Sequence, residues 1–83
     1  MYRILILRRA MRDIAKLPRE YGRLIGQHID GLAENPRPPD AKKLEAERGY
    51  SLRVGVYRIL YEIDDTARTV TVLRVRHRRE AYR

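Results

Sequence analysis

Apolar residues in the first 34 positions follow two different periods. A short apolar run within residues 2–7, flanked by arginines, predicts a β-strand. Residues 9–17 place their apolar side chains on one stripe, which predicts a helix. Pro18 either ends this helix or opens the next one at its first turn. Residues 19–34 predict a longer amphipathic helix, stopped by Asn35 and Pro36, because apolar side chains recur every three or four positions. That stripe contains Tyr21, Leu24, Ile25, His28, Ile29 and Leu32.

The rest of the chain alternates apolar and polar residues in the way that is typical of strands. Residues 35–49 contain three prolines and are expected to form a loop. Strands are predicted at residues 50–54, 57–63 and 69–75, with a turn at 64–68. Short connections make these strands an antiparallel meander. The order β-α-α-β-β-β therefore predicts an α+β fold, in which two N-terminal helices pack on one face of a small antiparallel sheet.

The hairpin between the strands at 50–54 and 57–63 decides which side chains share a face. With Gly55 and Val56 as a two-residue turn, Arg53 lies directly opposite Arg58 on the outer face of the sheet. The core face of this hairpin then contains Tyr50, Leu52, Val54, Tyr57, Ile59, Tyr61 and Ile63, and its outer face also contains Ser51, Leu60 and Glu62.

Folding alone does not explain two arginines in direct opposition. Like charges at such positions destabilise a sheet by about 0.2–1 kcal/mol. An anion held between Arg53 and Arg58 reverses the sign of that interaction. If the loop at 64–68 has five residues, Arg74 or Arg76 from the last strand can join the same face. The alternative is that these arginines extend into solvent and pair with nearby glutamates.

The composition favours a nucleic-acid partner. The chain has 83 residues, is expected to form one domain over 1–83, and carries a net charge of +8 with a pI near 10.4. Residues 48–83 contain nine arginines and no lysine. Because a guanidinium group makes bidentate phosphate contacts, this bias favours RNA. A basic composition that serves only solubility is the alternative.

The residues that the sequence lacks exclude other classes of site. There is no cysteine, which excludes disulfides and thiolate metal sites, and two histidines are too few for a zinc site, so no cofactor is expected. The apolar run at residues 4–7 is too short for a signal peptide or a membrane span, so a cytoplasmic location is expected.

Four parts of the sequence together resemble the RelE/ParE toxin superfamily, and most closely its RelE branch. They are YSLRVGVYRILYEI at 50–63, the Asn-Pro end of the second helix, the Lys-Leu pair at 43–44 and the terminal VRHRREAYR at 75–83. The resemblance covers essentially the whole chain. It implies a ribosome-dependent endoribonuclease that cuts mRNA in the ribosomal A site, without a metal, by attack of the RNA 2′-OH. It also implies a cognate antitoxin that silences the toxin.

The resemblance assigns roles to individual residues. Arg53 and Arg58 match basic positions on two adjacent strands, Arg78 matches an arginine after the last strand, and Tyr82 matches a tyrosine near the C-terminus. These four, with His77, are the expected catalytic residues. Contacts to RNA phosphates are expected from Ser51, Arg74, Arg76 and Arg79. Ser51 is a departure, since the best-studied members carry a lysine there.

Proton transfer has two candidate carriers. Arginine is a poor proton shuttle at neutral pH, whereas His77 can exchange protons there. Tyr82 is the other candidate, as an acid or base or as a stacking platform for a nucleobase. Asp40 and Glu45 in the proline-rich loop can also reach the site, or are solvated loop charges. His28 lies on an apolar stripe and is expected to be a semi-buried, hydrogen-bonded histidine.

Two rival functions stay open. The ParE branch shares the fold but poisons DNA gyrase and is not a nuclease. A catalytically degenerate, nucleic-acid-binding member is the third possibility, which Ser51 keeps open. In both toxin branches we expect an antitoxin partner, with a helical, acidic segment that lies across the sheet or displaces residues 76–83.

Overall fold

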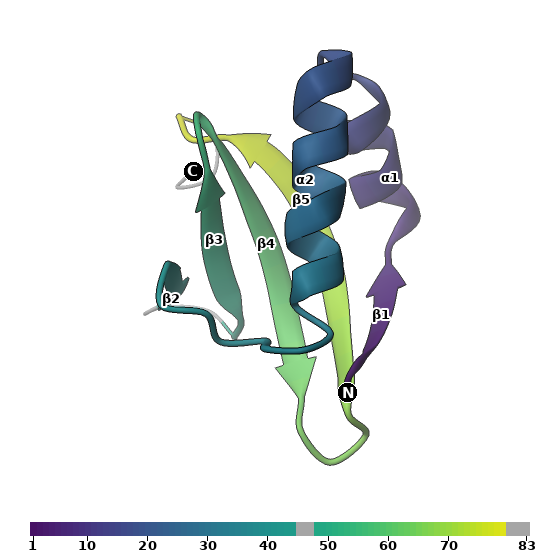
Figure 1. Cartoon of the computed structure of the whole chain (residues 1–83), viewed down its shortest axis with the longest axis vertical. Coiled ribbons are helices and arrows are strands. Elements are labelled where there is room, and N and C mark those ends of the chain that lie inside the picture. Colours follow the sequence, from purple (N-terminus) through teal and green to yellow (C-terminus); the bar gives the residue numbers. More distant parts are fainter. Residues whose placement is uncertain (45–47, 80–83) are drawn as a thin grey trace.

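The computed structural model describes residues 1–44 and 48–79, which form two helices and five strands (Figure 1). The predicted α+β order is confirmed. The one strand absent from the prediction lies in the proline-rich segment. The elements are β1 (Arg3–Ile6), α1 (Arg8–Ala15), α2 (Arg19–Gly31), β2 (Ala41–Lys43), β3 (Tyr50–Val54), β4 (Tyr57–Asp64) and β5 (Thr69–His77).

The five strands form one sheet in the order β1-β5-β4-β3-β2. β3, β4 and β5 make the predicted antiparallel meander, and β2 adds to its edge against β3. β1 runs parallel to β5, so the sheet is mixed and the expectation of a purely antiparallel sheet was wrong. The two helices between β1 and the meander supply the long connection that parallel pairing needs. Residues 35–49 were expected to be loop throughout, but Ala41–Lys43 pair with β3.

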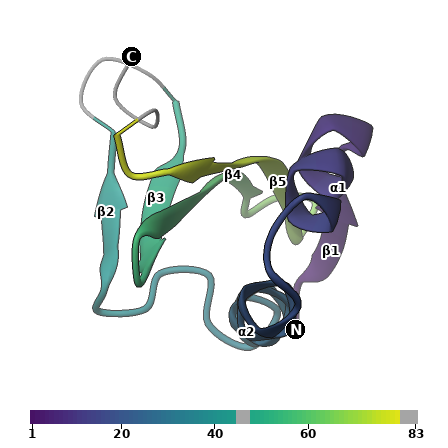
Figure 2. The same cartoon turned by 90° about the horizontal axis from the view of Figure 1, so that it is seen from above.

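The core lies on one face of this sheet. α2 crosses that face, and α1 lies beside β5 (Figures 1 and 2). Burial of apolar surface stabilises this layer by about 25 cal/mol for each Å² removed from water. Its buried residues are Ala10, Ile25, Ile29, Leu32, Leu52, Val54, Ile59, Tyr61, Val70, Val72 and Val75. The hairpin residues predicted to face the core belong to this cluster or pack against it.

Two tyrosines and an arginine fix the segment between α2 and β2. The buried Tyr61 hydroxyl donates to the Pro36 carbonyl over 2.8 Å, and burial raises the pKa of Tyr61 to about 12. Arg37 donates to both carboxylate oxygens of Asp65 at 3.1 and 2.9 Å, and its Nε donates to the Tyr50 hydroxyl at 3.0 Å. The segment that leads into β2 is therefore held to β3, to β4 and to the turn that follows β4.

Candidate functional site

Three arginines lie side by side across the outer face of the sheet. Arg53 of β3 is the direct cross-strand partner of Arg58 of β4, as predicted, and Arg58 is in turn the partner of Arg76 of β5. Directly opposite residues share a face and have Cβ atoms about 4.5–5.5 Å apart. We call Arg53, Arg58 and Arg76 the arginine row.

A β-bulge brings Arg76 into this row. β5 pairs Val72 with Tyr61 but Arg74 with Leu60, so Leu73 is an extra residue in the ladder. Val70 and Val72 face the core. Without the bulge, alternation would carry Arg74 and Arg76 to the core face as well. The bulge instead turns Val75 inward and Arg74 and Arg76 outward.

A pocket of about 490 Å³ opens beside two members of the row. Three cationic side chains and one carboxylate line it, so its lining is net positive. Charged groups held by a sheet scaffold present fixed positive charge to a phosphate, which is a suitable arrangement for binding it and for stabilising added negative charge. The lining residues are Pro39, Asp40, Lys42, Arg53, Gly55 and Arg58.

The β3–β4 turn ties the end of β5 to this pocket. Arg53 Nε donates to the Gly55 carbonyl at 3.2 Å, and the Arg78 backbone N–H donates to the Val56 carbonyl at 2.7 Å. Gly55 has φ +61° and lies against Tyr21, whose ring would be 3.2 Å from an added Cβ. Arg78, a predicted catalytic residue, is therefore anchored at the same turn that Arg53 contacts.

Arg74, predicted to bind phosphate, makes an ion pair in the free protein. Its guanidinium donates to both oxygens of Asp13 on α1, at 2.8 and 3.1 Å, and the Val75 N–H donates to the same carboxylate at 3.0 Å. Burial by itself raises the pKa of Asp13, but the hydrogen bonds from Arg74 and Val75 and the charges of Arg74 and Arg76 outweigh it and leave the pKa below its usual value. Arg74 thus links β5 to α1.

His77 does not join the arginine row. It lies opposite Tyr57, on the face away from Arg58, and the two rings meet edge to face with centroids 5.8 Å apart. Its Nδ1 accepts the Arg79 N–H at 3.3 Å. Arg79 itself is exposed. Tyr82, another predicted catalytic residue, lies outside the described residues.

Ser51 lies on the outer face but does not reach its surface. The residue is 2 % exposed, between Lys42 on β2 and Leu60 on β4. Within residues 1–44 and 48–79, its hydroxyl oxygen has no hydrogen-bond partner. The structure therefore does not bring Ser51 to the pocket that Arg53 and Arg58 line.

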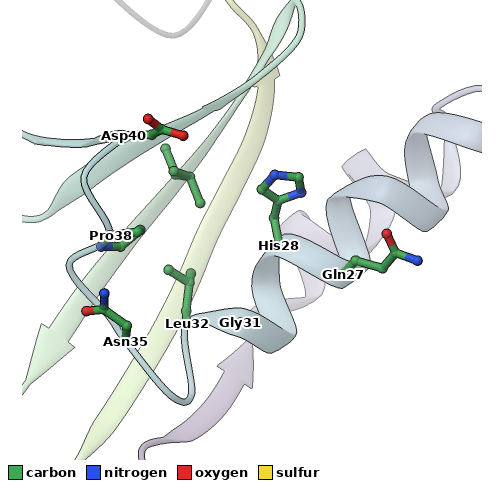
Figure 3. A pocket seen from close by; sticks show the side chains of 8 residues that line it. Gln27, His28, Gly31, Leu32, Asn35, Pro38 and Asp40 are labelled. Atoms are coloured by element: carbon green, nitrogen blue, oxygen red, sulfur yellow. The ribbon is translucent and has the colours of Figure 1, made fainter.

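A second pocket, of about 290 Å³, separates α2 from the segment before β2 (Figure 3). His28 of α2 and Leu32, the residue directly after α2, project toward it, across from Pro38 and Asp40. His28 is half-buried and its Nδ1 donates to the Leu24 carbonyl at 2.9 Å, which satisfies it as expected. This pocket has no arginine in its lining.

Lys42 is the pocket residue that the sequence analysis missed. It was placed in a loop, and only the pairing of β2 with β3 brings it to the outer face.

Among the described residues, no three His, Asp or Glu side chains gather in a way that could hold a metal ion. Neither helix of the described chain is long and apolar enough to cross a membrane.

Comparison with known proteins identifies the family. Residues 4–82 match the family described as the ParE toxin of the type II toxin–antitoxin system parDE. Toxin RelG of Mycobacterium tuberculosis is 40 % identical over 76 residues, which cover 89 % of this chain and 87 % of that protein.

Solved structures agree with this match. The fold is similar to the toxin–antitoxin complex RelBE2 of Mycobacterium tuberculosis, with a TM-score of 0.82, 35 % identity, and 92 % of this chain and 96 % of that chain covered. It is also similar to the archaeal RelE–RelB complex of Pyrococcus horikoshii, with a TM-score of 0.83, 27 % identity, and 96 % and 98 % covered. Because these matches span nearly the whole chain, the protein belongs to the RelE/ParE superfamily of toxins of type II toxin–antitoxin systems.

Proposed function

We propose that this toxin is a ribosome-dependent endoribonuclease that cleaves mRNA in the ribosomal A site and so inhibits translation in the cytoplasm. The observation that carries the proposal is the arginine row on the outer face, with Arg53 and Arg58 lining one pocket. Like charges in direct opposition destabilise the sheet. In this proposal a bound phosphate backbone offsets the repulsion between the arginines. The two solved relatives compared above are RelBE2 and RelE–RelB complexes, which supports the same branch.

The proposed reaction is a metal-independent transesterification. The RNA 2′-oxygen bonds to the adjacent phosphorus as the bond from phosphorus to the 5′-oxygen breaks, which leaves a 2′,3′-cyclic phosphate and a 5′-OH. Negative charge builds up on the phosphorane-like transition state. Fixed donors aimed at developing charge are worth about 2.7–4 kcal/mol each in other enzymes, and Arg53, Arg58 and Arg78 are the groups we assign to this role.

One proton must leave the 2′-OH and another must reach the 5′-oxygen. We keep Tyr82 and His77 as the candidate carriers, with Tyr82 preferred. His77 packs against Tyr57 on the face away from Arg58, which weighs against it. Arg76 and Arg79 are assigned to RNA phosphates. We assign no direct RNA contact to Arg74, because it pairs with Asp13, or to Ser51, because it is buried.

A cognate antitoxin is the proposed protein partner. Similar toxins have been solved as RelB complexes. An acidic helical segment laid over the arginine row would neutralise its charge and cover the pocket at once. Loss of toxicity would then follow from occlusion of Arg53 and Arg58, without unfolding of the toxin.

Gyrase poisoning is the second candidate, because the family that matches residues 4–82 is described by the ParE toxin.

An assay with purified protein and ribosomes programmed with a defined mRNA distinguishes the nuclease from the gyrase poison. The nuclease proposal requires cleavage at the A-site codon, and Arg58→Ala should reduce it by orders of magnitude while Arg23→Ala, on exposed α2 surface, leaves it unchanged. Inhibition of gyrase supercoiling without any mRNA cleavage would overturn the proposal in favour of the ParE activity.

A further inference from the structure

Lys42 lies beside the position at which the resemblance to the RelE branch implies a lysine and this chain has Ser51. It is the cross-strand partner of Ser51, and it lines the pocket that contains Arg53 and Arg58. We infer that the Lys42 ammonium group binds an RNA phosphate together with Arg53 and Arg58, and so supplies from β2 the positive charge that Ser51 does not provide on β3. The inference rests on the proposed function, since it assigns a further ligand to the same pocket.

Ser51 itself is unsuited to this role. It carries no charge, and at 2 % exposure its hydroxyl does not reach the pocket. Directly opposite residues on neighbouring strands project from the same face. The exposed Lys42 therefore extends from the same part of the outer face, over a residue too small to compete for the space.

Among the residues that the structure describes, the Lys42 side chain makes no polar contact that would explain its position. Within residues 1–44 and 48–79, its ammonium group takes part in no ion pair or side-chain hydrogen bond. Asp40, two residues earlier, lines the same pocket and leaves its charge net positive. A flexible lysine on an edge strand can follow a phosphate backbone as a compact point charge, whereas the arginines provide fixed forks.

Lys43 is a matched control within the same strand. It is exposed like Lys42 but lies opposite Tyr50, so it projects from the other face. It lines a different pocket, together with Arg37 and Asp65. Replacement of either lysine by glutamine removes one positive charge from the same three-residue strand. A difference in RNA affinity between the two variants therefore depends on which face of the sheet the lysine lies on, and not on the net charge.

The experiment measures binding of a fluorescent 2′-O-methyl RNA oligonucleotide, which cannot be cut because its nucleophile is blocked. Fluorescence anisotropy is followed over a series of salt concentrations. Lys42→Gln should weaken binding about tenfold and lower the slope of log affinity against log salt by about 0.7, as expected for the loss of one phosphate contact to a single strand. Lys43→Gln should stay within about twofold of the unmodified protein, and Lys42→Arg should retain the affinity. Equal losses in the two glutamine variants would overturn the inference.

Cleavage on programmed ribosomes separates this inference from the proposed nuclease. If the unmodified toxin binds RNA through Lys42 but never cuts mRNA, the phosphate site stands and the nuclease proposal fails. If it cuts mRNA, and Lys42→Gln binds and cuts as Lys43→Gln does, the nuclease proposal stands and the role of Lys42 is refuted.

Discussion

Arg53 and Arg58 are direct cross-strand partners in the β3–β4 hairpin, with both guanidinium groups on the face away from the core. Arg76 continues the row from β5. The hairpin would fold as well with glutamine at position 53, because Arg53 is exposed and its one described side-chain bond goes to the nearby Gly55 carbonyl. We therefore expect Arg53 to contribute little to the stability of the free protein, in keeping with the anion-binding role proposed above.

Replacing Arg53 should separate stability from activity. Arg53→Gln removes one of two opposed charges, so the free energy of unfolding should stay level or rise by up to about 1 kcal/mol at low salt. Cleavage on programmed ribosomes should fall by at least about a hundredfold, since a donor to the transition state is lost. Urea unfolding at two salt concentrations and the cleavage assay give the two quantities.

Arg23→Gln is the comparison for Arg53→Gln, because Arg23 is exposed on α2. It should change neither quantity. A clear loss of stability in Arg53→Gln would mean that the arginine holds the hairpin turn, and the opposed pair would then need no ligand to explain it.

The proton carrier can be found by comparing two single changes. His77→Gln should keep cleavage within about tenfold of the unmodified toxin, because His77 packs against Tyr57 away from Arg58. Tyr82→Phe should lower it by about 10²–10⁴ and flatten the dependence of the rate on pH, as expected when a general acid or base is removed. The reverse ranking would assign the proton transfer to His77.

Asp13 should stabilise the fold in a pH-dependent way. Its carboxylate accepts from Arg74 and from the Val75 N–H, with 14 % of its side chain exposed. Asp13→Asn should lower the free energy of unfolding by about 1–3 kcal/mol at pH 7, since Arg74 is left partly buried without its counter-charge. Because the folded-state pKa of Asp13 is lowered, this contribution is fully present above about pH 4 and disappears as the pH falls through the lowered pKa.

The matched carboxylate is Asp30, which is exposed on α2. Asp30→Asn should alter stability by no more than about 0.5 kcal/mol at any pH. Unfolding free energies from pH 2 to 7 test both variants. A constant difference between Asp13→Asn and the unmodified protein over this range would contradict the assignment of the pH dependence to Asp13.

The hairpin was the most predictable part of the site. Alternation of apolar and polar residues, with a two-residue turn, gave both the pairing of Arg53 with Arg58 and the core-facing set correctly. This succeeded because a slip of one residue would expose Leu52 and Val54, which makes the register strongly specified. Local pattern was sufficient in this hairpin, where β3 and β4 pair without a bulge.

Three features of the site depend on contacts that local pattern does not contain. The bulge at Leu73 turns Arg76 outward, yet nothing in the run Val70 to Val75 marks the position of an extra residue. β2 is too short and too polar to show alternation, so Lys42 was assigned to a loop. The pairing of Arg74 with Asp13 joins residues 61 positions apart, and so it became visible only in the folded chain.

Asp65 should titrate far below an ordinary carboxylate. The Arg37 guanidinium and the Tyr2 hydroxyl, which donates at 2.6 Å, hold the pKa of Asp65 at about 2. Its stabilising effect is therefore present above about pH 4 and is lost as the pH falls toward 2. NMR titration of the carboxyl carbon should show the low midpoint, and Arg37→Gln should move it up toward the usual value near 4. An unchanged midpoint in that variant would rule out Arg37 as the main cause.

Gly49 should be essential to the edge that carries Lys42. Its φ of +113° is a conformation that other residues rarely adopt, and an added Cβ would lie 2.6 Å from the Tyr61 carbonyl oxygen. Gly49→Ala should destabilise the protein by at least about 2 kcal/mol through backbone strain and this clash. Because the Leu44 N–H donates to the Gly49 carbonyl at 3.1 Å, the variant should also disturb the pairing of β2 with β3 and weaken RNA binding.

Gly26→Ala provides the opposite expectation for the same chemical change. Gly26 lies within α2, and an added Cβ would meet nothing within 4 Å. The substitution should stabilise the protein by about 0.5–1 kcal/mol, because alanine favours the helix and restricts the unfolded chain, and RNA affinity should stay unchanged. Urea unfolding with anisotropy on both variants tests the pair. If Gly49→Ala binds RNA as Gly26→Ala does, the edge strand is not needed for the phosphate pocket, and the contribution of Lys42 would have to come from a conformation that does not depend on β2.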